Sequence, residues 1–270
     1  MPEISVIITT YNRKDFASEA AASVRKQTCA DYELIIVDDG SSDGSSETLP
    51  MKADKYIFQK NAGVSAARNA GFKASSGKYI CFLDSDDLWM KDKLAVQIDF
   101  MKKHPSMPLC YTGEKWLKNG IHKNQRKRHS KRGGDIFSKC LEMCIISPSS
   151  AMIRREMLEL LRFDEKLPVC EDYDMWLKIS SEHNIAYIPR ELIIKRGGHL
   201  DQLSAREPAM DRFRIYSIVK LLKSGLNAER ANLAKEELRR KCAIVRSGAL
   251  KRTKPWLWAK YGLISHLYGG

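Results

Sequence analysis

The sequence has no run of eighteen apolar residues and therefore predicts no membrane-spanning helix. The stretch from Met1 to Ile4 has no basic segment followed by an apolar one, so we expect no secretory signal and a cytoplasmic protein. No Gly-x-Gly-x-x-Gly motif follows the first apolar run, which disfavours a dinucleotide-binding dehydrogenase. The seven cysteines are odd in number and scattered, without paired zinc spacing, so reduced packing groups are the better interpretation.

The chain has 270 residues, of which 43% are hydrophobic, and a formal net charge of +13. Its Lys and Arg residues gather between Lys115 and Arg132 and again in the C-terminal third. An excess of positive charge favours polyanionic ligands, which include nucleic acid, an anionic lipid surface and phosphorylated small molecules. The charge alone does not choose among them.

Apolar β-branched runs alternate with amphipathic segments, which predicts an α/β sheet with crossover helices. The segment 118–134 is polar and basic without an apolar period, and we expect it to be a mobile loop. From residue 208 onward the pattern is helical. We expect strands over 4–10, 32–37, 56–58, 78–83, 110–112, 149–153, 186–188 and 192–194, and helices over 15–27, 63–75, 88–104, 136–143, 155–161, 171–177, 211–223 and 227–250.

Clustered carboxylates follow the apolar run 79–83. Carboxylates at the end of a buried strand cost stability unless they are solvated, paired or bound to a cation. Asp84 and Asp86 are two residues apart, so on an extended segment they point the same way. Hard divalent ions such as Mg²⁺ or Mn²⁺ prefer such oxygen ligands. A turn or helix cap is the alternative role for these residues.

Polar residues also follow the first two expected strands, at 9–11 and 38–39. In open α/β sheets, ligands bind outside the carboxyl ends of the strands. Three polar clusters at one edge of a sheet point to a binding site more specifically than any one of them.

Five ordered motifs resemble the family 2 glycosyltransferases, which have the GT-A fold; they lie at 5–13, 37–43, 61–71, 83–87 and 171–177. The resemblance covers roughly residues 2 to 200 and leaves 208–270 uncovered. It implies an α/β fold with a mixed sheet flanked by helices, followed by a C-terminal helical extension. We expect a catalytic domain over 1–205, a helical extension over 206–270 and a bacterial enzyme of the inverting type.

The resemblance assigns residues to the nucleotide-sugar donor: Thr9, Tyr11, Arg13, Asp39, Arg68, Asp84 and Ser85. The first three hold the base, and Asp39 contacts the base or ribose with acceptor-only oxygens. Arg68 presents a fork of donors to the diphosphate. The alternatives are a plain turn at Asp39 and a solvated helix charge at Arg68.

The same resemblance implies a divalent cation, Mn²⁺ or Mg²⁺. Asp86 would be the direct metal ligand, and Asp84 would lie near the ribose or the metal. His199 is a candidate third ligand, with a surface turn as its alternative. Lys195 and Arg196 would touch the diphosphate or be solvated.

An attacking hydroxyl must lose a proton, so a carboxylate base is needed opposite the leaving group. By the resemblance, Asp172 is that base, and Glu171 assists it or contacts the acceptor. The alternative is an acidic cluster at the start of a helix, which suits Asp174 better. In-line displacement implies inversion at the anomeric carbon.

The expected donor is a UDP-sugar, with a dTDP-sugar next, and the acceptor is a saccharide or lipid-linked molecule of cell-envelope polysaccharide or lipopolysaccharide synthesis. One rival is a nucleic-acid-binding protein that uses the basic run 123–132, although we expect no nucleic-acid partner. Another is a nucleotidyltransferase, but the segment 9–12 lacks the glycines of an activating loop.

Basic residues surround two tryptophans between Lys251 and Trp258. That mixture suits peripheral contact with the inner leaflet of the plasma membrane. The alternative is that this tail packs on the catalytic domain or on a second subunit of a homodimer.

Overall fold

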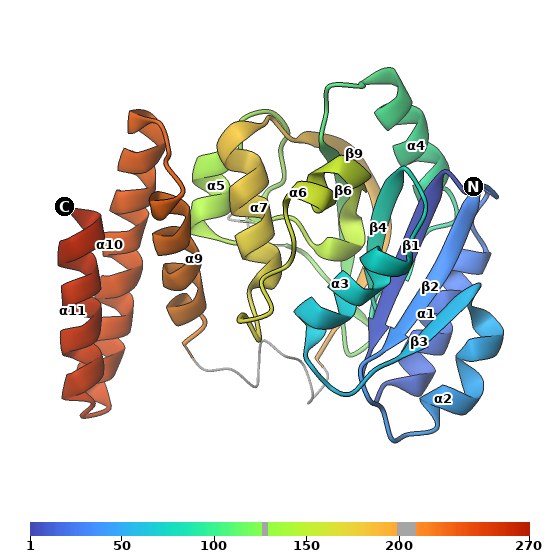
Figure 1. The fold of residues 1–270 in the computed structure, drawn as a ribbon, viewed down its shortest axis with the longest axis horizontal. Helices are drawn as coiled ribbons and strands as arrows, with labels where there is room; N and C mark the ends of the chain where they lie inside the picture. Colours follow the sequence, from blue (N-terminus) through green and yellow to red (C-terminus); the bar gives the residue numbers. More distant parts are fainter. Residues whose placement is uncertain (126–128, 199–208) are drawn as a thin grey trace.

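The computed structural model describes residues 1–125, 129–198 and 209–270 and contains a mixed β-sheet with helices on both faces (Figure 1). The strands run in the order β3-β2-β1-β4-β8-β6-β9-β5, and β7 pairs with β6. The first four strands are mutually parallel. They are β1 (Ile4–Thr10), β2 (Tyr32–Asp38), β3 (Lys55–Phe58) and β4 (Tyr79–Asp84).

The second half of the sheet is largely antiparallel. β8 runs antiparallel to both β4 and β6, while β9 runs parallel to β6. β5 is antiparallel to β9, and β7 is antiparallel to β6. These strands are β5 (Leu88–Trp89), β6 (Leu109–Lys118), β7 (Ile121–Lys123), β8 (Ala151–Arg154) and β9 (Ala186–Gly197).

Alternation along β1 explains why the sheet is covered on both faces. Val6 and Ile8 join one apolar cluster with α1 (Lys14–Arg25) and α4 (Lys93–Lys103). Ile7 joins the other cluster, because successive side chains of a strand point to opposite faces. The helices that share its cluster are α3 (Val64–Ala74), α5 (Phe137–Glu142), α6 (Arg155–Leu160) and α7 (Glu171–Glu182). The short helices are α2 (Ser45–Thr48), η1 (Pro50–Lys52) and η3 (Pro148–Ser150).

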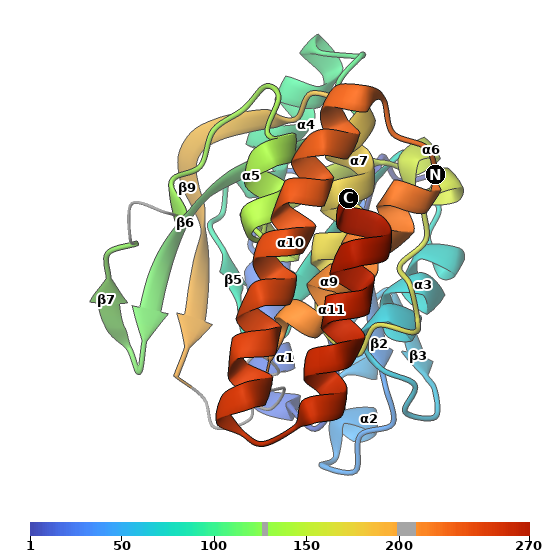
Figure 2. The same ribbon diagram turned by 90° about the vertical axis from the view of Figure 1, so that its left-hand side faces the viewer.

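The C-terminal helices lie beside α7, on the side away from the parallel strands (Figures 1 and 2). They are α9 (Asp211–Lys223), α10 (Ala228–Lys251) and α11 (Pro255–Gly269). Ile215 and Ile218 of α9 are buried in the cluster that contains α7. Asn227 caps α10 by accepting a hydrogen bond from the Arg230 amide at 2.9 Å, as a capping side chain does. Within the described ranges, no helix combines the length and apolar character needed to span a bilayer.

The expected mobile loop over 118–134 is wrong in its described part. β6 extends through Lys118 and turns back into β7, and the isolated bridge of Gly134 with Ile185 anchors the other end. Asn119 and Gly120 have positive φ values of 51° and 78°, as a tight hairpin requires. This Asn-Gly pair is the signal that would have predicted the hairpin.

Other element boundaries also differ from the sequence prediction. The strand expected over 149–153 begins only at Ala151, because the residues before it form η3. The expected helix over 88–104 begins only at Lys93, because Leu88 and Trp89 form β5 and pair with β9. The two short strands expected at 186–188 and 192–194 are parts of one strand, β9. The domain boundary expected between residues 205 and 206 falls outside the described residues and stays a prediction.

Candidate active site

Backbone pairing brings the three polar clusters together. Thr9 is the β-partner of Asp84, and Thr10 is the partner of Asp38. The ends of β1, β2 and β4 therefore lie side by side, as the strand pattern predicted.

Arg68 of α3 is buried at the centre of this edge, so the expected alternative of a solvated charge is wrong. Its side chain is 3% exposed, and Nη2 lies 2.7 Å from Asp84 Oδ1. Its Nη1 pairs with Glu171 Oε1 at the start of α7. Burial disfavours the charge on Arg68, but Glu171 and Asp84 outweigh it and raise the guanidinium pKa. The arginine joins the metal-motif strand to the helix that carries the expected base.

Glu171 is buried, and burial raises its pKa to about 7. Arg68 opposes this shift, while the neighbouring charge of Asp172 adds to it. One arginine thus serves two carboxylates, with a third close by. Such a site favours an additional cation or a proton, because the carboxylates outnumber the buried positive charge.

Asp86 forms the second ion pair at the edge. Arg13, the residue just before α1, places Nη1 2.9 Å from Asp86 Oδ2, and each side chain is 16% exposed. Arg196 of β9 donates from Nε to the Asp86 carbonyl at 2.6 Å. Arg196 also pairs with Glu19, so it holds the turn after β4 and is not merely solvated.

Asp87 and Lys195 form part of the support behind this turn. Asp87 is 1% exposed, accepts from Ser149 Oγ at 2.7 Å, and has its pKa raised to about 8 by burial. Burial opposes the charge on Lys195, but Asp87 and Glu114 raise the pKa of the ammonium group. Sequence patterns predicted no role for Asp87, because its side-chain contacts are with residues that are distant along the chain.

Asp39 holds the loop that precedes α3. Its Oδ1 accepts from the Ala62 amide at 2.9 Å and from Gln59 Nε2 at 2.6 Å, and its Oδ2 accepts from the Gly63 amide at 2.8 Å. Gly63 has φ of 92°, which a residue with a side chain rarely adopts. These contacts match the alternative role of a turn residue, and the contact of Asp39 with a base stays a prediction.

The other expected donor-binding residues lie around the same edge. Tyr11 is 46% exposed, Thr9 is half-buried and Ser85 is buried. Asn12 has φ of 51° and accepts from the Ser42 amide at 2.8 Å, which joins the loop after β1 to the loop after β2. This contact fixes the residue that directly follows Tyr11.

Asp172 is half-buried in the first turn of α7, next to Glu171. Its Oδ2 accepts a hydrogen bond from Cys144 Sγ at 3.1 Å. Burial and the nearby Asp172 charge raise the pKa of the Cys144 thiol well above its usual value, so this sulfur keeps its proton. Asp174, by contrast, is 2% exposed and pairs with Lys178 and Lys220, which fits its expected structural role.

The residues present suit a hard divalent ion. Each ion pair uses only one oxygen of its carboxylate, Oδ1 of Asp84 and Oδ2 of Asp86. Mg²⁺ and Mn²⁺ accept such carboxylate oxygens and complete their shells with phosphate or water oxygens. The third expected ligand, His199, lies outside the described residues, and among the rest no three His, Cys, Asp or Glu side chains gather as metal ligands.

The basic run after β6 is partly buried. Lys131 is 5% exposed and pairs with the buried Glu114, which also accepts from Ser147 Oγ at 3.0 Å. Lys131 Nζ donates to the Ile145 carbonyl at 2.9 Å as well. This ion pair fastens the segment after β7 to the sheet, so Lys131 is not part of a solvated loop.

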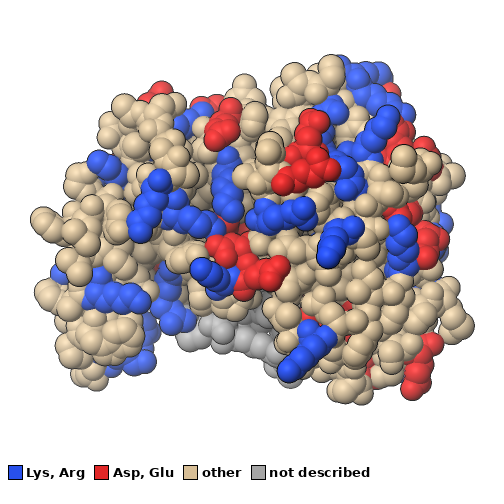
Figure 3. All heavy atoms as spheres, viewed as in Figure 1, with Lys and Arg blue, Asp and Glu red and all other residues tan. Residues whose placement is uncertain are grey.

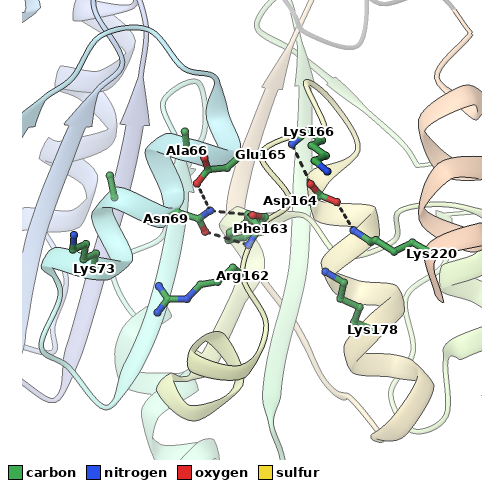
Figure 4. Close-up of a pocket in the computed structure, with 11 residues that line it drawn as sticks. Ala66, Asn69, Lys73, Arg162, Phe163, Asp164, Glu165, Lys166, Lys178 and Lys220 are labelled. Carbon is green, nitrogen blue, oxygen red and sulfur yellow. Dashed lines mark hydrogen bonds and ion pairs between the residues drawn. The ribbon is translucent and has the colours of Figure 1, made fainter. Parts of the chain in front are cut away.

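A separate hollow of about 810 Å³ lies between α3 and the segment 162–166 (Figure 4). Asn69 Nδ2 donates to Glu165 at 2.9 Å, and Lys220 reaches Asp164 at 2.6 Å across it. Among the described residues, none assigned to the donor, the metal or the base lines this hollow. The sheet edge, not this hollow, is therefore the candidate active site.

The model of the family described as glycosyl transferase family 2 matches residues 5–162. An uncharacterized glycosyltransferase of Rickettsia conorii is 39% identical over 200 residues, which cover 70% of this chain and 32% of that protein. The chain thus spans about a third of the first Rickettsia relatives that it matches. An Escherichia coli UDP-Glc:alpha-D-GlcNAc-diphosphoundecaprenol beta-1,3-glucosyltransferase is 32% identical over 189 residues, which cover 68% of this chain and 72% of that protein.

Solved structures confirm the expected GT-A fold. The S. aureus TarS fragment in complex with UDP-GlcNAc superposes with a TM-score of 0.76 at 20% identity, covering 96% of this chain and 79% of that one. A Pyrobaculum calidifontis mannosyltransferase in complex with GDP-Man and Mn²⁺ gives 0.61 at 18% identity, covering 99% and 87%. With its motifs in order along this fold and the family model matching more than half of its length, the chain belongs to glycosyl transferase family 2.

Proposed function

We propose that this chain transfers a sugar from a nucleotide-diphosphate donor to a saccharide or lipid-linked acceptor, with inversion at the anomeric carbon and dependence on a divalent cation. A UDP-sugar is the favoured donor and a dTDP-sugar the next. The product belongs to cell-envelope polysaccharide or lipopolysaccharide synthesis, and the chain works on the cytoplasmic side of the membrane.

One observation carries this proposal. The buried Arg68 pairs with Asp84 at the end of β4 and with Glu171 at the start of α7, and Glu171 directly precedes Asp172, the proposed base. Arg13 holds Asp86 beside them. Sugar transfer requires both stabilisation of the leaving group and removal of a proton, and the ion pairs of Arg68 with Asp84 and Glu171 support a site that serves both.

Each side chain has a defined task in this reaction. Asp172 takes the proton from the attacking hydroxyl, and the Cys144 thiol orients its carboxylate. Arg68 and Arg13 offer donors to the diphosphate oxygens as these gain charge. Asp84 and Asp86 would hold the divalent cation, which when bound would supply charge neutralisation at the departing diphosphate.

The relatives support the class of donor and acceptor. The E. coli relative is named for transfer from UDP-Glc to a diphosphoundecaprenol-linked sugar, and the TarS structure contains UDP-GlcNAc. The mannosyltransferase structure contains Mn²⁺ together with GDP-Man. A uridine donor, a lipid-diphosphate acceptor and Mn²⁺ are therefore the first conditions to test.

The test is a thermal-shift screen of nucleotide sugars with and without Mn²⁺, followed by detection of released nucleoside diphosphate. We expect one UDP-sugar to raise the melting temperature only when Mn²⁺ is present, because a ligand that binds the folded state stabilises it. In Asp86→Asn, the UDP-sugar should no longer raise the melting temperature when Mn²⁺ is present. The matched control is Asp99→Asn, an exposed carboxylate paired with Lys103 on α4.

Two results would contradict the proposal. Equal stabilisation of Asp86→Asn and wild type would remove the assigned metal ligand. Absence of any nucleotide-sugar effect, in a protein whose melting is otherwise cooperative, would remove the assigned activity.

A further inference from the structure

Helix α11 carries two apolar stripes, and only one of them packs against the part of the chain that the structure describes. The first stripe packs on the core through the buried Tyr261 and the partly buried Leu257, Ile264 and Tyr268. The second consists of Trp256, Leu263 and Leu267. Both follow the spacing of one face of a helix, and the two faces are separated by about 100° because Trp256 directly precedes Leu257.

The second stripe is exposed. Trp256, Leu263 and Leu267 are 63%, 58% and 62% exposed. An isolated exposed apolar residue is ordinary, but a row along one helix face marks an interaction surface. We call this stripe, with Lys260 between Trp256 and Leu263, the α11 outer face.

The charge around the α11 outer face has a single sign. Residues 238–270 contain eight Lys or Arg residues and no Asp or Glu. Lys251, Arg252 and Lys254 are exposed in the turn just before α11, and Lys260 is exposed on the face itself. The end of the molecule where α10 and α11 lie shows basic side chains and no acidic ones along its lower part (Figure 3).

An exposed apolar stripe surrounded by positive charge favours one kind of binding partner over the others. A second copy of the chain, docked face to face, would bring two clusters of like charge together. A nucleic acid would meet the positive charge but would gain little from leucine side chains, because its phosphate backbone is polar. Tryptophan and lysine at the level of the head groups, with leucines directed into the acyl boundary, match an anionic lipid surface on every count.

We propose that α11 lies in the plane of an anionic lipid surface, with Trp256, Leu263 and Leu267 inserted and the turn over 251–254 against the lipid head groups. The helix lies on the membrane and does not cross it. This inference does not depend on the proposed activity, because lipid binding is measured without donor or acceptor.

Co-sedimentation of the whole chain with vesicles tests the inference. Vesicles of phosphatidylcholine mixed with phosphatidylglycerol should carry the protein down, while pure phosphatidylcholine vesicles should not, and added salt should weaken binding. The triple variant Trp256→Ala, Leu263→Ala, Leu267→Ala should reduce partitioning about tenfold or more, because each lost side chain removes buried apolar area. Lys251→Gln with Lys254→Gln should reduce partitioning and its dependence on salt.

Matched controls come from exposed residues elsewhere. Met51→Ala with Leu160→Ala removes side chains that are 83% and 79% exposed, and Lys26→Gln with Lys60→Gln removes two exposed charges. Neither control should change partitioning. The melting temperature of the triple variant should equal that of wild type, because its three side chains have little packing to lose.

Three outcomes would overturn the inference. The first is equal binding to neutral and anionic vesicles, or to neither. The second is unchanged partitioning of the triple variant. The third is a triple variant that only loses self-association in light scattering, or only loses binding to a duplex oligonucleotide, without a change at the vesicle.

Discussion

Charged side chains are buried in one region of the molecule and exposed in another. The first region is the edge formed by β1, β2 and β4, and the second is the turn and helix at the end of the hairpin formed by α10 and α11. At the edge, Arg13 and Arg68 are largely buried and each reaches a carboxylate within 3 Å. In the hairpin, Lys251 and Lys254 are exposed in a stretch without carboxylates. Charge is concentrated in both regions, but Arg13 and Arg68 are removed from water, whereas Lys251 and Lys254 are not.

This difference in burial indicates that folding constrains the charged residues of the edge but not those of the hairpin. A buried ion costs several kcal/mol unless its partner is in place, so the edge must be assembled before the protein is stable. An exposed lysine costs almost nothing, and its identity is set by what it meets outside the molecule. Substitutions at the edge should therefore change both stability and activity, whereas those on the α11 outer face should change neither.

The largest expected effect is on catalysis. Asp172→Asn keeps the shape of the side chain but removes its basicity, and should lower kcat about 10²- to 10⁴-fold, as loss of a general base does. Single-turnover transfer to an acceptor measures this. Glu229→Gln, at an exposed acid in the first turn of α10, is the control for a simple helix-dipole effect. Comparable losses in the two variants would remove Asp172 from the role of base.

The next effect is on stability. Arg68→Met leaves Glu171 and Asp84 without their cation and should lower the free energy of unfolding by about 3–5 kcal/mol. Arg25→Met breaks the exposed pair with Asp54 and should cost about 1 kcal/mol or less. Urea unfolding of both variants measures the contrast between a buried and an exposed pair. Equal losses would show that burial of Arg68 is not what makes its pairs important.

Local patterns predicted the edge well. Apolar runs end at Thr10, Asp38 and Asp84, and parallel pairing brings these ends together. The arrangement follows from the strand pattern because neighbouring parallel strands end at a common edge. The fold class and the positions of the strand ends were therefore available from the sequence.

The supporting contacts were not available, because they join residues that are distant along the chain. Cys144 meets Asp172 across 28 positions, and Arg68 meets Glu171 across 103. Nothing local marks either contact in advance. The hairpin at Asn119 is a different case, since its turn signal was present but was outweighed by the polarity of the surrounding segment.

A buried carboxylate outside the active site gives a smaller effect. Burial would raise the pKa of Glu33, but Lys55, Ser5 and Ser76 outweigh it and lower the pKa from 4.5 to about 2. A lowered folded-state pKa contributes stability that is complete above about pH 4.5 and is lost as the pH falls toward about 2.

Glu33→Gln tests this contribution. At neutral pH the variant should be less stable than wild type by about 1–3 kcal/mol, the usual loss when a charged hydrogen-bonding partner is removed. The difference should shrink as the pH falls below 4.5, because Glu33 of the unfolded wild-type chain then takes up a proton, whereas the folded chain does so only near pH 2. Urea unfolding across this pH range gives the result. A gap that is constant with pH would mean that the loss comes from packing and not from charge.

The smallest expected effect concerns the thiol that contacts the base. Cys144 Sγ donates to Asp172 Oδ2 at 3.1 Å, and its raised pKa keeps the proton on sulfur at neutral pH. Thiols are weak donors, so Cys144→Ala should lower kcat by less than about fivefold, which corresponds to less than about 1 kcal/mol. Cys144→Ser supplies a hydroxyl donor in the same place and should restore the rate. If the Ala and Ser variants have the same kcat, the sulfur only fills space beside α7. If only the Ser variant recovers the wild-type kcat, the hydrogen bond from residue 144 orients the Asp172 carboxylate, although residue 144 touches no substrate.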